Sequence, residues 1–197
     1  MLFRSSVLPG RYLVRLTAGG KTLSASLSVV MDPRVMTPAA GLRQQHQIET
    51  HLAALINESF DAQAEVRGLD HQLETLAKQA SGPVAEAVGA LRKKVSGLAE
   101  SRRGVSAPPS PEPTLSRVAG ELGQLYGQVG GSDAAPTATQ TAALAAVEKD
   151  DAEVMARWKA IKSTDLPALN RQLSGAGLAV IKLKAEPEPA SESEDEE

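Results

Sequence analysis

The pattern of hydrophobic and polar residues changes its period once along the chain, at Asp32-Pro33. Before this point apolar side chains alternate with polar ones, the period-two pattern of a β-strand with one buried face. After it, apolar residues recur at spacings of three and four almost to the end of the chain, as they do in α-helices. The sequence therefore predicts a short β-structure followed by a mainly helical region.

Residues 10–29 predict an antiparallel β-hairpin, because the Gly19-Gly20 pair between the two alternating segments readily takes the positive φ angles of a tight turn. A hairpin of two strands is only marginally stable in water, so its apolar face needs a cover. Either the face packs on the helices, or residues 1–36 are the last strands of a β-sandwich whose other strands lie elsewhere; we favour the second. The apolar face comprises Tyr12, Val14, Leu16, Leu23, Ala25, Leu27 and Val29.

Residues 37–183 predict an antiparallel helical bundle of about four helices plus a short fifth. The first helix should span about 38–80, and its apolar seam follows a four-three rhythm through four heptads. The fourth helix should stop at Ser163–Asp165, and residues 178–183 should be extended. The other helices are expected near 83–98, 114–129 and 166–173, and the fourth, which follows a loop at 130–136, carries its seam from Leu144 to Ile161. The seam of the first helix comprises Ile48, Leu52, Leu55, Ser59, Ala62, Val66, Leu69, Leu73 and Leu76.

Two segments are predicted to lie outside this packed structure: a proline-rich linker at 102–113 and a disordered acidic tail at 184–197. From Ala185 onward the tail has seven acidic and no basic residues, so the remainder of the chain is net positive by four. That excess is too weak and diffuse to indicate a nucleic-acid partner. No apolar run approaches the roughly 18 residues of a membrane span. Met1 to Gly10 lacks the apolar run of a secretory signal peptide.

No residue is predicted to be catalytic, cofactor-binding or metal-binding. The absence of cysteine excludes disulfides, thiolate zinc sites and thiol nucleophiles. Gly20-Lys21-Thr22 matches the end of a phosphate-binding loop, but Arg15 stands where that loop has its first glycine, and a strand follows. His46, His51 and His71 are separated by five and twenty residues, whereas two zinc ligands on one helix face are four apart.

Asp151 is the one charged residue in the seam of the fourth helix. It is either a buried partner of a lysine or arginine that fixes the register of the helices, or a carboxylate at a point where the seam opens to water. The second situation is the more common one. The charged residues around Asp151 fit a solvated helix face; they are Glu148, Lys149, Asp150 and Glu153.

Several short motifs together resemble one family. They are Val7 to Leu16 (Val-Leu-Pro-Gly-Arg-Tyr-Leu-Val-Arg-Leu), Gly20-Lys21-Thr22, Val30 to Val35, Leu125 to Gly127, Asp133 to Thr137, Trp158, and Asp165 to Asn170. In combination they are similar to the C-terminal region of large exported bacterial proteins of the sortilin-like, BNR/Asp-box repeat class, often labelled glycosyl hydrolases or sialidases. The resemblance covers most of residues 7–183.

The resemblance implies a β-propeller first, then an immunoglobulin- or fibronectin-like module, then a helical region. The hairpin would be the remnant of that sandwich. The parent protein would be exported to the periplasm, the cell surface or the medium. The propeller and its Asp-box pattern (Ser-x-Asp-x-Gly-x-Thr-Trp) are absent from this sequence. Catalytic residues of such a parent would lie in the propeller, so none is assigned to this chain.

The leading hypothesis is a non-catalytic C-terminal interaction or structural module of such a sortilin-like protein. It would pack on its parent's propeller, on another copy in a homo-oligomer, or on a cell-envelope partner. One alternative is a fragment that takes its glycosyl hydrolase or sialidase label from the missing propeller. Another is a free-standing coiled-coil adaptor or chaperone whose acidic tail is solubilising or binds basic partners. The predicted contact surfaces are Leu23, Ala25, Leu27 and Val29 on the hairpin, and Ile48, Leu52 and Leu55 on the first helix.

Overall fold

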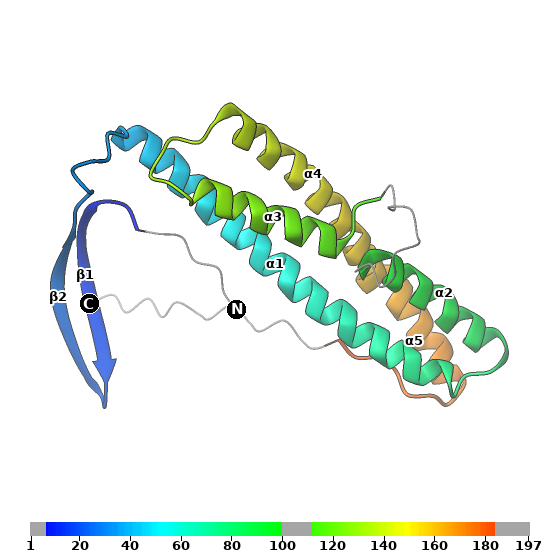
Figure 1. The fold of residues 1–197 in the computed structure, drawn as a ribbon. Helices are drawn as coiled ribbons and strands as arrows, with labels where there is room; N and C mark the ends of the chain where they lie inside the picture. Colours follow the sequence, from blue (N-terminus) through cyan, green and yellow to red (C-terminus); the bar gives the residue numbers. More distant parts are fainter. Residues whose placement is uncertain (1–6, 100–111, 184–197) are drawn as a thin grey trace. The chain divides into compact units, whose positions relative to one another are not determined.

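The structure, a computed structural model, describes residues 7–99 and 112–183. The predicted acidic tail and all but the last two residues of the predicted linker lie outside these residues. The predicted class is confirmed: the described chain is mainly α-helical, with a β-hairpin before the helices (Figure 1). The elements are β1 (Gly10–Ala18), β2 (Lys21–Val29), α1 (Ala39–Ala77), α2 (Gly82–Ala99), α3 (Leu115–Val129), α4 (Ala138–Ala160), the π-helix η1 (Ile161–Asp165) and α5 (Leu166–Gly175).

The hairpin forms as the alternation predicts. Gly19 and Gly20 have φ angles of 56° and 72°, and two consecutive positive values are those of a type I′ turn. The turn matches the right-handed twist of the strands and fixes their register, with Ala18 opposite Lys21. Gly20-Lys21-Thr22 is therefore part of a hairpin rather than a phosphate-binding loop. On one face, this register pairs Tyr12 with Leu27, Val14 with Ala25 and Leu16 with Leu23.

A tight turn at Asp32-Pro33-Arg34 separates the hairpin from the helices. The backbone N–H of Arg34 donates to Asp32 Oδ1 over 2.9 Å, and the N–H of Val35 donates to the Asp32 carbonyl oxygen, also over 2.9 Å. The Arg34 guanidinium donates to the same carboxylate, and this hydrogen bond lowers the pKa of Asp32 and raises the pKa of Arg34. The change of sequence period thus coincides with a locally bonded turn.

The chain divides into two compact units. Unit 1 comprises Met1–Phe60 and Arg117–Glu153, so it holds the hairpin, the first part of α1, most of α3 and the first part of α4. α1 and α3 run antiparallel (Figure 1), and Gln45 on α1 donates to the carbonyl oxygen of Val129 at the end of α3 over 2.9 Å. The buried apolar residues of unit 1 are Leu42, Leu52, Ala53, Ile56, Val118, Leu122, Leu125, Val129 and Val147.

The start of α4 is fixed by a capping box. The backbone N–H of Gln140 donates to Thr137 Oγ1 over 3.1 Å, and the Thr137 backbone N–H donates to Gln140 Oε1 over 2.9 Å. These reciprocal bonds satisfy two backbone donors that a helix start would otherwise leave unpaired. The sequence Thr-Ala-Thr-Gln from Thr137 to Gln140 carries this signature, and α4 begins at Ala138, the residue after Thr137.

Unit 2 comprises Asp61–Ser116 and Val154–Glu197 and is built on the second part of α1, α2, the end of α4, η1 and α5. Its largest fully buried side chain is Trp158, which is 1% exposed. The predicted seams supply this core, because apolar residues at spacings of three and four lie on one helix face. The main buried residues are Val66, Leu69, Leu73, Leu76, Val88, Leu91, Val95, Leu98, Leu115, Val154, Trp158, Ile161, Leu166, Leu169 and Leu173.

The predicted helix stop at Ser163–Asp165 is wrong, because the backbone stays helical through these residues as the π-helix η1. The N–H of Leu166 donates to the carbonyl oxygen of Ile161, the i→i+5 bond of a π turn. Pro167 explains the local widening: its ring would clash with the carbonyl of Ser163, and it has no N–H to donate. The Ser-Thr-Asp sequence before proline therefore marks a change of helical pitch rather than an end.

The described residues 178–183 form no strand or helix. Ile181 is nevertheless buried, and the side-chain amide of Asn170 on α5 bonds both of its backbone groups. Asn170 Oδ1 accepts from the Ile181 N–H over 2.8 Å, and Asn170 Nδ2 donates to the Ile181 carbonyl oxygen over 2.9 Å. The Asn170 amide thus satisfies both backbone groups of Ile181, as a neighbouring strand would in a sheet. Within the described ranges, no helix is both long and apolar enough to cross a membrane.

Candidate interaction surface

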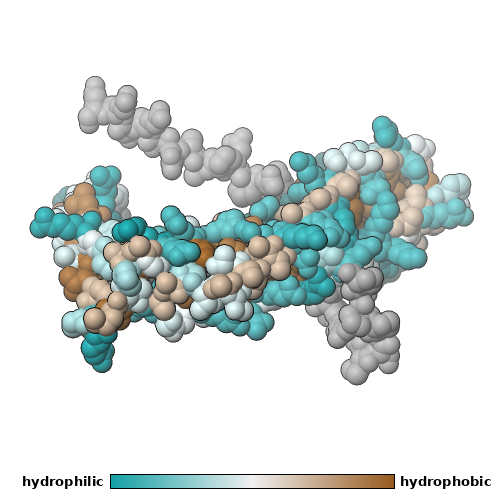
Figure 2. All heavy atoms as spheres, turned by 90° about the horizontal axis from the view of Figure 1, so that it is seen from above, coloured by the Kyte–Doolittle hydropathy of each residue, from teal (hydrophilic) through white to brown (hydrophobic). Residues whose placement is uncertain are grey.

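The apolar face of the hairpin is open to solvent. Leu16, Leu23 and Leu27 are 61%, 69% and 50% exposed, although leucine is among the residues most often buried in folded proteins. In Figure 2 hydrophobic side chains reach the surface at the left of the view, where Figure 1 draws the hairpin. We call the set Tyr12, Val14, Leu16, Leu23, Ala25, Leu27 and Val29 the hairpin face. Such contiguous apolar exposure is the usual mark of a contact surface.

The opposite face of the hairpin is different in character. It pairs Arg11 with Ser28 and Arg15 with Ser24, and the Thr17 and Thr22 hydroxyls lie 3.1 Å apart in a hydrogen bond. Leu13 is the one large apolar side chain on this side. One apolar and one polar face are typical of an antiparallel sheet that is covered on one side and solvated on the other.

Tyr12 makes a hydrogen bond at the start of β1 that ties the strand to the preceding segment. Its hydroxyl donates to the carbonyl oxygen of Leu8, four residues upstream, over 2.5 Å. A tyrosine near a strand start that bonds back to the upstream backbone is typical of the tyrosine corner in immunoglobulin-type sandwiches. The sequence reasoning missed this bond, although Leu8-Pro9-Gly10 before Tyr12 is the segment in which it forms.

The predicted contact residues on α1 lie in a different environment from those on the hairpin. Leu52 is fully buried in the core of unit 1, and Ile48 and Leu55 are half-buried. Of the hairpin residues, Leu23, Ala25 and Leu27 are exposed and Val29 is half-buried. A contact role for either set stays a prediction, and the exposed residues are concentrated on the hairpin.

Asp151 is buried, which corrects the expectation that it lies where the seam meets water. Asp151 is 6% exposed, and Ser59 Oγ on α1 donates to Asp151 Oδ1 over 3.2 Å. The partner is thus a hydroxyl, where we had considered a cation. Burial raises the pKa of Asp151, and nearby Glu58 raises it further, while the Ser59 bond and His51 oppose the shift. His51 Nε2 itself lies 2.6 Å from Glu148 Oε1.

Replacing Asp151 by asparagine should stabilise the protein at neutral pH. A carboxyl whose pKa is raised on folding favours the folded state when protonated, so its contribution is lost as pH rises through the folded pKa. Asparagine keeps an acceptor for Ser59 without the buried charge. The melting temperature of Asp151→Asn should exceed that of the wild type by a few degrees at pH 7. The difference between the two melting temperatures should shrink as the pH falls toward the ordinary aspartate pKa.

The control for this comparison is Glu153→Gln, which removes one carboxylate from an exposed position of the same helix. Its melting temperature at pH 7 should stay close to that of the wild type. If Asp151→Asn melts no higher than Glu153→Gln at pH 7, the Asp151 carboxylate does not destabilise the folded state.

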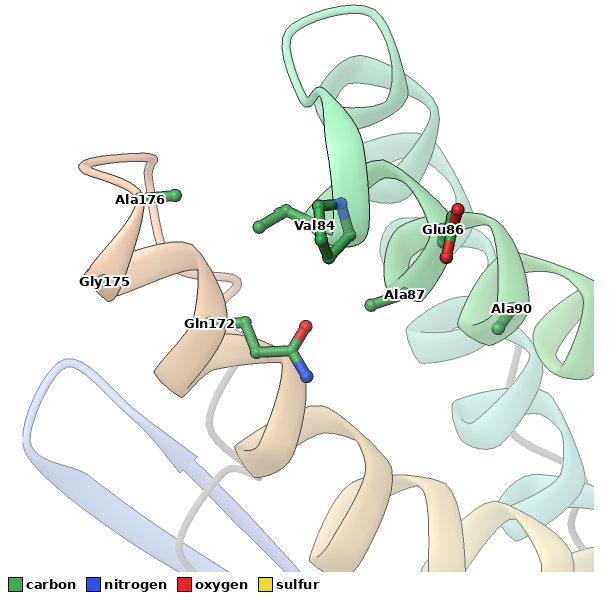
Figure 3. Close-up of a pocket in the computed structure, with 8 residues that line it drawn as sticks. Val84, Glu86, Ala87, Ala90, Gln172, Gly175 and Ala176 are labelled. Atoms are coloured by element: carbon green, nitrogen blue, oxygen red, sulfur yellow. The ribbon is translucent and has the colours of Figure 1, made fainter.

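A shallow groove of about 660 Å³ lies between the start of α2 and the end of α5 in unit 2. Val84 and Ala87 from α2 and Gln172 from α5 border the space between these helices (Figure 3). Among the described residues that line it, Glu86 is the one carboxylate. Among residues 7–99 and 112–183, no three histidine, aspartate or glutamate side chains gather as a metal site would require.

Comparison with family models, curated proteins and solved structures found no match to this chain.

Proposed function

We propose that the chain is a non-catalytic interaction module of a larger exported protein of the sortilin-like class. In this proposal β1 and β2 are the last two strands of an immunoglobulin-like sandwich, and the hairpin face docks on the second sheet of that sandwich. The helical units would follow the sandwich as a structural module. The single observation that carries the proposal is the hairpin face, on which three leucines are at least half exposed.

Two further features support a sandwich as the cover. The Tyr12 hydroxyl bonds the Leu8 carbonyl oxygen in the manner of a tyrosine corner, a feature of Greek-key sandwiches rather than of isolated hairpins. The sequence resemblance, whose first motif includes Leu8 and Tyr12 themselves, implies an immunoglobulin- or fibronectin-like module at this point of the parent chain. Both features concern residues at the start of β1.

The size of the hairpin face favours a covalently linked partner. Each strand has nine residues, and at about 3.3 Å per residue and about 4.8 Å per strand the face covers roughly 300 Å². A stable interface between separate proteins buries about 800 Å² per partner. A partner sheet in the same polypeptide needs less area, because its effective concentration is about millimolar or higher.

Trypsin cleavage of the intact protein, encoded by the complete reading frame, tests this docking. Arg11, Arg15 and Lys21 are trypsin sites within the hairpin. In the wild-type intact protein they should be protected. The double substitution L23Q/L27Q should accelerate cleavage at these sites by about tenfold or more, because it removes two leucines from a buried sheet contact. Mass spectrometry of the fragments gives the rate at each site.

The matched control is S24Q/S26Q, which adds two glutamines to the opposite face of the same strand. It should change the cleavage rates by less than about twofold, since surface substitutions have small effects. Equal cleavage of the wild type and both variants in the intact protein would mean that nothing docks on the hairpin face.

A further inference from the structure

A second hollow in unit 2 has the composition of a ligand site. This cavity, of about 600 Å³, lies among α2, the end of α4 and η1. Its floor is apolar, with Leu98 from α2 and Ile161 from η1 both buried. Small residues keep it open: Ala90, Gly97 and Ala160 line it, and a Cβ built on Gly97 meets no atom within 4 Å. A concave apolar space of this volume is typical of small-molecule sites.

The rim of the cavity carries more positive than negative charge. Lys94 Nζ pairs with Asp165 Oδ1 at 2.8 Å, and Arg157 Nη1 pairs with Glu112 Oε2 at 3.4 Å. The third cation, Lys93, is exposed, and within the described part of the chain it has no ion-pair partner. Among the described lining residues, the two pairs leave the Lys93 ammonium without a counter-charge at the edge of the apolar space.

The π turn shapes the wall on the α4 side. Ile161 and Asp165, the first and last residues of η1, both line the cavity, as do Arg157 and Ala160 one turn earlier. The i→i+5 bonding forced by Pro167 widens the backbone at this point. An apolar floor residue and a rim carboxylate that holds Lys94 therefore come from a single π turn.

We propose that this cavity binds an amphipathic carboxylate, a ligand with an aliphatic chain and one terminal anionic group. The chain would lie against Leu98, Ile161 and the small residues, and the carboxylate would pair with Lys93. Such a ligand satisfies both halves of the site, since it fills apolar space and supplies the missing negative charge. This activity is separate from the docking of the hairpin face.

Decanoate is the probe for this site, with decyltrimethylammonium as a probe of equal chain length and opposite charge. Binding of each probe is measured by calorimetry. The protein carries L23Q/L27Q so that the hairpin face does not bind the probes. Decanoate should bind one site, and the cationic probe should bind at least about tenfold more weakly, because the rim is positive.

Two matched pairs of variants test the position of the ligand. Gly97→Leu fills the cavity, whereas Gly89→Leu makes the same change on α2 at an exposed glycine that does not line it. Both replace a helical glycine with a better helix former, so neither should unfold α2. Gly97→Leu should abolish decanoate binding and Gly89→Leu should leave it unchanged. Lys93→Gln should weaken binding roughly two- to fivefold, and Lys159→Gln at an exposed site of α4 should not.

The proposal is overturned if decanoate fails to bind, if Gly97→Leu binds it as well as Gly89→Leu, or if the cationic probe binds equally tightly. None of these results bears on the hairpin face, because the measurement is made with that face already substituted.

Discussion

Leu69→Asp should unfold unit 2 at 25 °C. Leu69 lies on α1, is 0% exposed and belongs to the seam that the second part of the helix contributes to the core. The substitution removes a buried leucine, at a cost of about 2–5 kcal/mol. It also places a carboxylate among buried apolar side chains, which adds several kcal/mol more. Since a domain has about 5–15 kcal/mol of stability in total, the folded state of unit 2 should not survive.

Trp158 fluorescence and the far-ultraviolet circular dichroism report this change, since the single tryptophan lies in unit 2. The control is Ala64→Asp, which adds the same carboxylate five residues earlier on the exposed side of α1. It should melt within a few degrees of the wild type. A wild-type melting curve for Leu69→Asp would contradict the helix register described above.

Trp158→Ala should cost unit 2 about 3–5 kcal/mol of unfolding free energy, the usual cost of deleting a large buried aromatic side chain. Trp158 also makes specific contacts. Its Nε1–H donates to Glu65 Oε2 over 3.0 Å, and Lys162 Nζ donates to the same oxygen over 3.1 Å. The Lys162 ammonium lies 5.4 Å from the centre of the indole ring, within the range of a cation–π contact.

Trp158→Phe distinguishes the contribution of the buried ring to stability from that of the hydrogen bond. It keeps most of the apolar volume but removes the donor to Glu65. Its loss of unfolding free energy should therefore fall between zero and that of Trp158→Ala. Urea denaturation followed by circular dichroism measures both variants. Val180→Ala, a truncation at a side chain that is 43% exposed, should cost less than about 0.5 kcal/mol. A loss under about 1 kcal/mol for Trp158→Ala would contradict a tightly packed site.

The elements that were predictable from the sequence are those whose cause is local. The Gly19-Gly20 turn sets the hairpin register without help from the rest of the chain, and the four-three rhythm locates α1 to within a few residues. The seam residues from Ser59 to Leu76 are buried as that rhythm requires. Residue pattern was sufficient there because backbone period and side-chain burial follow from the same geometry.

The features that could not be predicted depend on contacts between distant segments. Asp151 is buried and accepts a hydrogen bond from Ser59, ninety-two residues away, and no local pattern contains that pairing. The π turn at Ile161–Asp165 was mistaken for a stop, because a proline signal does not say whether a helix ends or widens. The cavity beside Lys93 is formed by three elements whose packing the sequence does not specify.

We propose that another part of the intact protein covers the hairpin face. The most direct test is maleimide labelling of single-cysteine variants, which is clean because the chain contains no cysteine. Leu27→Cys reports the hairpin face and Ser26→Cys reports the opposite face one residue away. In the isolated chain both cysteines should be modified at similar rates. In the protein expressed from the complete reading frame, Leu27→Cys should be protected and Ser26→Cys should not. Equal labelling of the two positions in that protein would contradict the account.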